Sequence, residues 1–159
     1  MASLFDAHQR STLEAVTGRI IPADRDPGAL EAGVVDYIEN ALAGYDAEHA
    51  LLYVDGIKEL DRLAREKFSA EAFVQLGADQ QDQIVALLDE RRSPFFSHLL
   101  EHTMQGFYGD PRHGGNRNRV GWKMIGFPGP SHPEGYRRPF GWYDENIPDD
   151  FEPEKKRGK

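Results

Sequence analysis

The sequence predicts a small all-α protein: a bundle of about five helices followed by a long irregular extension rich in glycine, proline and aromatic residues. Through the first hundred residues, apolar side chains recur every three to four positions, which is typical of amphipathic helices. No segment alternates apolar and polar residues in the manner of a strand, apart from short pieces such as residues 119–127. After residue 109 the helical periodicity stops, so the extension is expected to be irregular.

The first helix is expected to begin at Ser3, with Asp6 completing a capping box, and to stop before Pro22. A second helix is expected from about Leu30 to Leu42, with Gly44 suited to its carboxyl end. The residues expected to face the core are Leu13, Val16 and Ile20 in the first helix and Leu30, Val34, Tyr37, Ile38, Ala41 and Leu42 in the second.

A third helix is expected over about residues 46–67 and, after a connection at 68–77, a fourth over about 79–91. Ser93 and Pro94 predict the start of a fifth, as N-cap and first helical residue. The apolar faces are expected to comprise Val54, Ile57, Leu60, Leu63 and Ala64, then Ile84, Val85, Leu87 and Leu88, then Phe95, Phe96, Leu99, Leu100, Met104 and Phe107.

A chain of 159 residues is long enough for one core, so residues 1–151 are interpreted as a single helical domain that includes an extension at about 108–143. Residues 152–159 are expected to form a charged, solvated tail. An irregular segment as long as this extension is uncommon in a compact domain and usually indicates function or partner contact.

The charge pattern argues against nucleic-acid binding. The net charge is −8, and residues 1–102 hold 9 Lys/Arg against 19 Asp/Glu, whereas residues 103–143 hold 6 basic and 2 acidic residues. The basic extension on an acidic body permits a local contact with an acidic partner but disfavours binding of nucleic acid or an anionic membrane by the whole protein. No apolar run is long enough for a transmembrane helix, so no direct membrane insertion is expected.

The localisation depends on the amino terminus. The opening MASLFDAHQR resembles neither a signal peptide nor a twin-arginine leader. The chain as it stands is therefore expected in the cytoplasm, and in the periplasm if a twin-arginine leader has been removed.

Few residues suggest catalysis. The absence of cysteine excludes thiolate nucleophiles, disulfides and cysteine-ligated metals, and no P-loop or dinucleotide fingerprint is present. The Asp24/Asp26 and Asp89/Glu90 pairs lie at turns and helix ends, where capping and solvation explain them. We therefore predict no catalytic, cofactor-binding or metal-binding residue in this chain.

One alternative is a small helical metal-binding protein or enzyme. His98 and His102 are four residues apart and share a helix face, a spacing that can hold a metal, with His113 or His132 as further ligands. The two histidines are expected to flank the core-facing apolar side chains of the fifth helix, as surface or half-buried polar residues.

The extension is interpreted as a protein-docking surface, because Trp, Tyr and Arg are enriched in binding hot spots. Glycines are expected to let the backbone lie against a partner, Trp122, Trp142 and Tyr136 to bury area, and Asn116 to hold a turn through its side chain. The predicted partner-binding residues are Tyr108, Asp110, Arg112, His113, Gly114, Gly115, Asn116, Arg117, Arg119, Gly121, Trp122, Lys123, Phe127, Tyr136 and Trp142.

Two segments resemble the small (gamma) subunit of gluconate 2-dehydrogenase, the subunit 3 family: RIIPADRDPGALEAGVVDYIENAL at 19–42 and HTMQGFYGDPRHGGNRNRVGWKMIGFPGP at 102–130. The second contains the family's Asp-Pro, Gly-Gly-Asn, Gly-Trp and Gly-Phe-Pro-Gly motifs, with His113 where a tyrosine is common. The resemblance covers about residues 4–142.

The resemblance implies a non-catalytic accessory subunit. In the family, the large partner is a flavoprotein of the glucose–methanol–choline (GMC) type that binds FAD and oxidises a sugar or polyol, and electrons often pass to a cytochrome c subunit. The small subunit assists folding, stability and export of the large one. FAD is therefore expected in the partner and no cofactor in this chain. A free-standing structural adaptor is a further alternative.

Overall fold

The computed structural model describes residues 4–130. The chain divides into two units, Met1–Pro128 and Gly129–Lys159, and the helices found among the described residues belong to the first. Over the described residues the fold has six α-helices and no strand, which confirms the predicted all-α class. None of these helices is long and apolar enough to cross a membrane.

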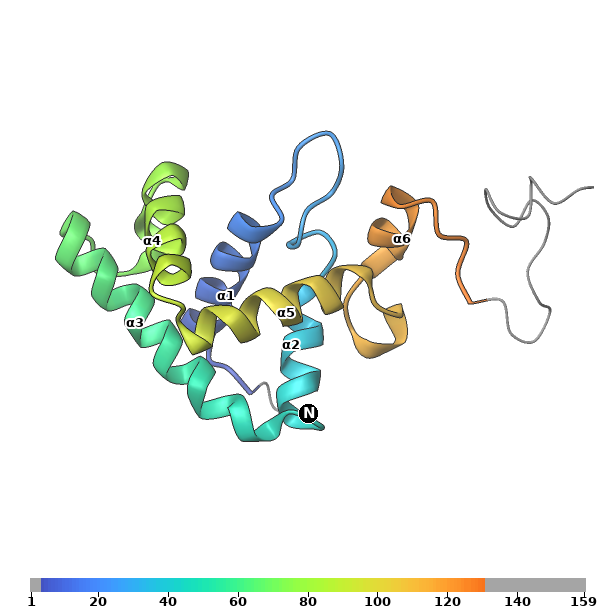
Figure 1. The fold of residues 1–159 in the computed structure, drawn as a ribbon, viewed down its shortest axis with the longest axis horizontal. Coiled ribbons are helices and arrows are strands. Elements are labelled where there is room, and N and C mark those ends of the chain that lie inside the picture. Colours follow the sequence, from blue (N-terminus) through green and yellow to red (C-terminus); the bar gives the residue numbers. More distant parts are fainter. Residues whose placement is uncertain (1–3, 131–159) are drawn as a thin grey trace, which may run out of the picture. The chain divides into compact units, whose positions relative to one another are not determined.

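Helix α1 is central to the bundle, because it contacts α2, α3, α4 and α5. Figure 1 shows α5 crossing the bundle, with α3 and α4 near its first residues and α6 beyond its last ones. The elements are α1 (Ala7–Ile20), α2 (Val34–Ala43), the 3₁₀ turn η1 (Ala47–His49), α3 (Ala50–Phe68), η2 (Phe73–Gln75), α4 (Ala78–Glu90), α5 (Pro94–Tyr108), η3 (Pro111–His113), η4 (Arg117–Arg119) and α6 (Val120–Met124).

The start of α1 differs from the prediction. The helix begins at Ala7 and is capped by Asp6, whose carboxylate accepts a hydrogen bond from the Gln9 amide at 2.8 Å. The Gln9 side chain accepts one from the Asp6 amide at 3.0 Å, so the capping box lies three residues later than the one predicted from Ser3. At α5 the prediction is confirmed, with Ser93 as N-cap and Pro94 as the first helical residue.

Helix α2 is shorter than predicted. It begins at Val34, because Gly33 adopts the left-handed conformation (φ 68°) and separates the preceding turn from the helix. Leu30 therefore lies outside the helix, and its side chain is 55% exposed rather than inward. The predicted carboxyl end at Gly44 is confirmed.

The core prediction is wrong in part for α5. Leu100 and Met104 are exposed, while His102 and Thr103 are buried. The reason is the close contact with α2 at Gly106, where an added Cβ would lie 3.1 Å from the Tyr37 side chain. Helix α5 turns this small residue toward α2. The largest fully buried side chains of the core are Tyr53, Phe73, Phe107, Leu13, Ile38, Leu42, Ile57, Leu60, Leu63, Ile84, Leu88 and Leu99. Val54, Val85 and Leu87 are half-buried.

Candidate partner-binding surface

Residues 109–119 form a loop that folds back on the end of α5, and Asn116 is its anchor. The Asn116 side chain is fully buried (0% exposed). Its Nδ2 donates to the Gly109 carbonyl at 2.8 Å, its Oδ1 accepts from the Gly121 amide at 2.9 Å, and its own amide donates to the Gly106 carbonyl at 2.7 Å. These bonds confirm that Asn116 holds a turn through its side chain.

Glycines of the loop and of α6 pack against the chain itself. A Cβ on Gly115 would lie 2.1 Å from the Gly106 carbonyl oxygen, and one on Gly121 would lie 2.1 Å from the Phe107 carbonyl oxygen. Both distances are far inside van der Waals contact, so only glycine fits at these positions. The glycines were expected to let the backbone lie close to a partner, but here they let it lie close to α5 of the same chain.

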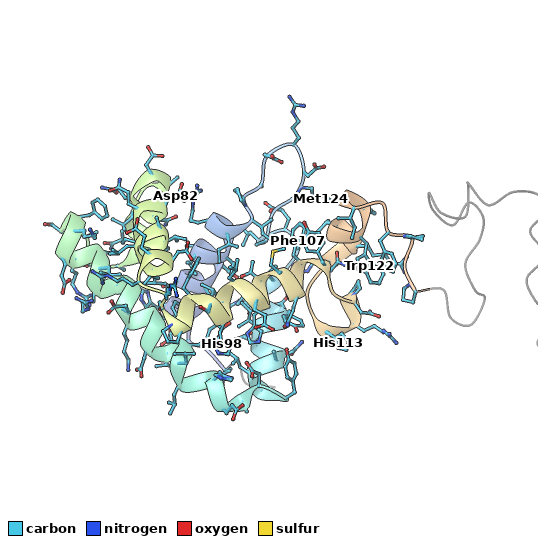
Figure 2. The ribbon with its side chains drawn as sticks, in the orientation of Figure 1. Asp82, His98, Phe107, His113, Trp122 and Met124 are labelled. Atoms are coloured by element: carbon cyan, nitrogen blue, oxygen red, sulfur yellow. The ribbon has the colours of Figure 1, made fainter. Side chains whose placement is uncertain are left out.

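Trp122 is buried rather than exposed. Its side chain is 6% exposed, and the indole Nε1 donates to the Tyr108 carbonyl at 2.7 Å. The Phe127 ring packs edge-on against it with centroids 5.1 Å apart, and the Arg119 guanidinium lies 6.0 Å from the ring centre. Figure 2 shows Trp122 at α6, beyond the end of α5. The indole therefore joins α6 to α5 and offers a partner little area.

Two of the four cations of the loop and α6 are paired internally. Arg112 forms an ion pair with Asp110, and this pair holds the pKa of the Asp110 carboxyl well below its usual range, at about 2. Arg117 pairs with Asp36 of α2, and its amide donates to the Ala32 carbonyl at 2.9 Å. Over residues 4–130 we find no ion pair for the other two cations, Arg119 and Lys123, which are exposed.

Exposed apolar side chains lie on the outer face of α5 and at the end of α6. Leu100, Met104 and Tyr108 follow at intervals of four residues and so share one helix face, and the Tyr108 hydroxyl contacts Met124 Sδ at 3.8 Å. We call this set the apolar stripe; its members are Leu100 (40% exposed), Met104 (44%), Met124 (42%), Ile125 (59%) and Phe127 (37%). Sequence reasoning misses this surface, since apolar spacing alone assigns Leu100 and Met104 to the core.

An open cavity of about 460 Å³ lies between α2, α5 and the loop. Its wall is a polar network in which the Tyr37 hydroxyl donates to Gln105 Oε1 at 2.7 Å and Asn40 Nδ2 donates to the His113 carbonyl at 3.0 Å. Burial raises the pKa of Tyr37 above its usual range. The lining residues are Tyr37, Asn40, Ala41, Tyr45, Gln105, Arg112 and His113.

The two histidines of α5 have different surroundings. His102 is buried, contrary to the prediction, and its Nδ1 shares a 2.7 Å hydrogen bond with the Tyr53 hydroxyl. Burial lowers the pKa of His102, which favours the neutral ring. His98, labelled in Figure 2, is half-buried, and its ring lies 4.0 Å from that of His49. The pair predicted from spacing is thus split between two environments.

The predicted partner-binding residues from Tyr108 to Phe127 are brought together at the junction of α5, the loop and α6. Tyr136 and Trp142 lie outside the described residues, as does His132. Nothing in the described part of the chain tests partner binding, so the assignment stays a prediction.

A family model matches most of the chain. The model of the family described as gluconate 2-dehydrogenase subunit 3 matches residues 7–129. No curated protein and no solved structure matches the chain. The two segments that carry the resemblance, 19–42 and 102–130, contact each other through Arg117 and Asp36 and through His113 and Asn40.

Proposed function

This chain belongs to the gluconate 2-dehydrogenase subunit 3 family, and from that premise we propose that it is a non-catalytic small subunit of a dehydrogenase complex. It binds and stabilises a GMC-type large subunit. The large subunit holds FAD and oxidises a sugar or polyol, and its electrons pass to a cytochrome c subunit or another acceptor. If a leader directs the small subunit to the periplasm, the folded large subunit is exported with it.

The apolar stripe is the observation that supports this proposal best. Its five members are each more than a third exposed, and contiguous exposed apolar surface is typical of protein–protein contacts. Complete burial of an exposed apolar side chain contributes about 1.5–3 kcal/mol, and because these side chains are already about half-buried, each contributes roughly half of that in an interface. A partner that covers the stripe removes this surface from water, which accounts for a helix face that the fold itself leaves open.

The loop next to the stripe supports the same conclusion. It is held in one conformation by Asn116 and by the Arg117–Asp36 pair, so a partner orders little additional chain on binding. Arg119 and Lys123 supply positive charge beside the stripe. Acidic groups of the large subunit are their expected counterparts, and these contacts are expected to speed association more than to strengthen it.

Co-expression tests the proposal. We expect the flavin-loaded, soluble large subunit to fall sharply in yield when this chain is omitted. Met104→Glu and Ile125→Glu place a charge in the stripe and should weaken the complex by at least about tenfold, the loss of one hot-spot residue. Leu51→Glu is the matched control, because Leu51 is 75% exposed on α3, away from the stripe. A large subunit with equal yield and activity on its own would contradict the proposal.

A further inference from the structure

A cluster of metal-ligating side chains lies at the corner between α2 and α3, where it faces α5. Asp46 precedes η1, His49 ends it, and His98 comes from α5. Each of the three offers one ligand atom, and these atoms all lie within 4.8 Å of one another. In a tetrahedral zinc site with bonds of about 2.1 Å, the ligand atoms are about 3.4 Å apart. Side-chain movements of about 1 Å would therefore bring the cluster to coordination distance.

The hydrogen bonding of the Asp46 carboxylate is a second, independent observation that points to a bound ion. Its Oδ1 is 2.7 Å from His49 Nδ1, but its Oδ2 is buried and has no hydrogen-bond partner. His102 Nε2 lies 3.2 Å from this oxygen, close enough for an ion pair when the ring is protonated but outside hydrogen-bonding geometry. A buried carboxylate oxygen without a hydrogen bond is rare in folded proteins, and a bound ion satisfies such an oxygen by direct coordination.

We propose that Asp46, His49 and His98 bind one divalent transition-metal ion, with Zn²⁺ the best fit. Two imidazoles and a carboxylate suit Zn²⁺ better than Mg²⁺ or Ca²⁺, which prefer oxygen ligands throughout. Three protein ligands leave a fourth position for water or an exchangeable ligand. All three residues are half-buried, so an ion can reach them from solvent.

His102 lies behind the Asp46 ligand of this site. Its ring is buried between the Tyr53 hydroxyl on one side and the Asp46 carboxylate on the other. Groups behind a ligand commonly fix its orientation in metal sites. The bound ion would tie the α2–α3 corner to α5. The inference does not depend on partner binding.

The test uses the full chain without an affinity tag, stripped with chelator and then dialysed. Titration calorimetry with Zn²⁺ should give one ion per chain. At a hundredfold excess over Kd the melting temperature should rise by about 5–10 °C, whereas Mg²⁺ should leave it unchanged. Co²⁺ should give the intense visible absorption of a four-coordinate site.

His49→Ala and His98→Ala should each lower Zn²⁺ affinity by more than about 100-fold, since a lost ligand costs at least as much as a lost supporting group. His8→Ala is the matched control, because His8 lies on α1 and pairs with Asp61, outside the cluster. The Co²⁺ spectrum of the wild-type chain decides the question even if a variant fails to fold. Absence of binding, weak octahedral absorption, or equal losses in the control would overturn the proposal.

Discussion

Asn116→Ala tests the anchor of the loop. The substitution removes two side-chain hydrogen bonds, to the Gly109 carbonyl and from the Gly121 amide. Each is worth about 1 kcal/mol net, and the Gly121 amide left unpaired in a buried site costs about another 1–3 kcal/mol. Because Asn116 is left-handed (φ 47°), alanine adds a backbone strain of about 1 kcal/mol. The free energy of unfolding should fall by about 4–6 kcal/mol in total.

Asn118→Ala is the control for strain alone. Asn118 is also left-handed (φ 58°) but exposed, and we find no side-chain hydrogen bond for it within residues 4–130. The free energy of unfolding of the Asn118→Ala variant should fall by about 1 kcal/mol. Urea denaturation in a Trp142→Phe background measures both variants and reports Trp122 emission alone. Equal losses in the two variants would refute the reasoning that the buried amide, rather than the turn conformation, holds the loop.

Two further predictions concern the loop. Gly115→Ala should release the loop from α5 and shift Trp122 emission to longer wavelength, because the added Cβ would lie 2.1 Å from a backbone oxygen. Gly18→Ala on α1 is the control: nothing lies within 4 Å of its Cβ, so it should stabilise the chain by about 0.5–1 kcal/mol. Arg112→Ala should raise the pKa of Asp110 from about 2 toward 3.8, as followed by NMR titration of the carboxyl. Because the pKa is lower in the folded chain, the contribution of this pair to stability is present above pH about 4 and is lost as the pH falls toward 2. An unchanged Asp110 titration would show that the ion pair does not form in solution.

Local signals in the sequence predicted the helices well. Ser93 and Pro94 identified the start of α5, and Gly44 identified the end of α2, because capping depends on residues adjacent in the chain. The Asn116 turn was predictable for the same reason. The errors at Ser3 and Leu30 arose where several neighbouring residues could serve as the N-cap. In the structure the N-caps of α1 and α2 are Asp6 and Gly33.

Long-range packing explains what the sequence missed. Helix α6 has five residues and is held by tertiary contacts of Trp122 and Gly121, so no periodicity reveals it. Leu100 and Met104 share the apolar spacing of α5, yet the close approach to α2 turns them outward.

The histidine cluster is hidden from sequence reasoning for a related reason. Spacing along α5 suggests the pair His98 and His102, but the fold brings His98 to Asp46 and His49 instead. About fifty residues separate the two parts of the cluster, and only the packing of α5 on the α2–α3 corner brings them together.

The most direct test of the central claim is a pull-down of the tagged chain from its native host, with an absorption spectrum and sequencing of the eluate. The proposed function predicts one co-purifying GMC-type protein with flavin absorption bands, and its loss when Met104→Glu and Ile125→Glu are combined. A colourless, monodisperse monomer from the wild-type chain would contradict the accessory-subunit function.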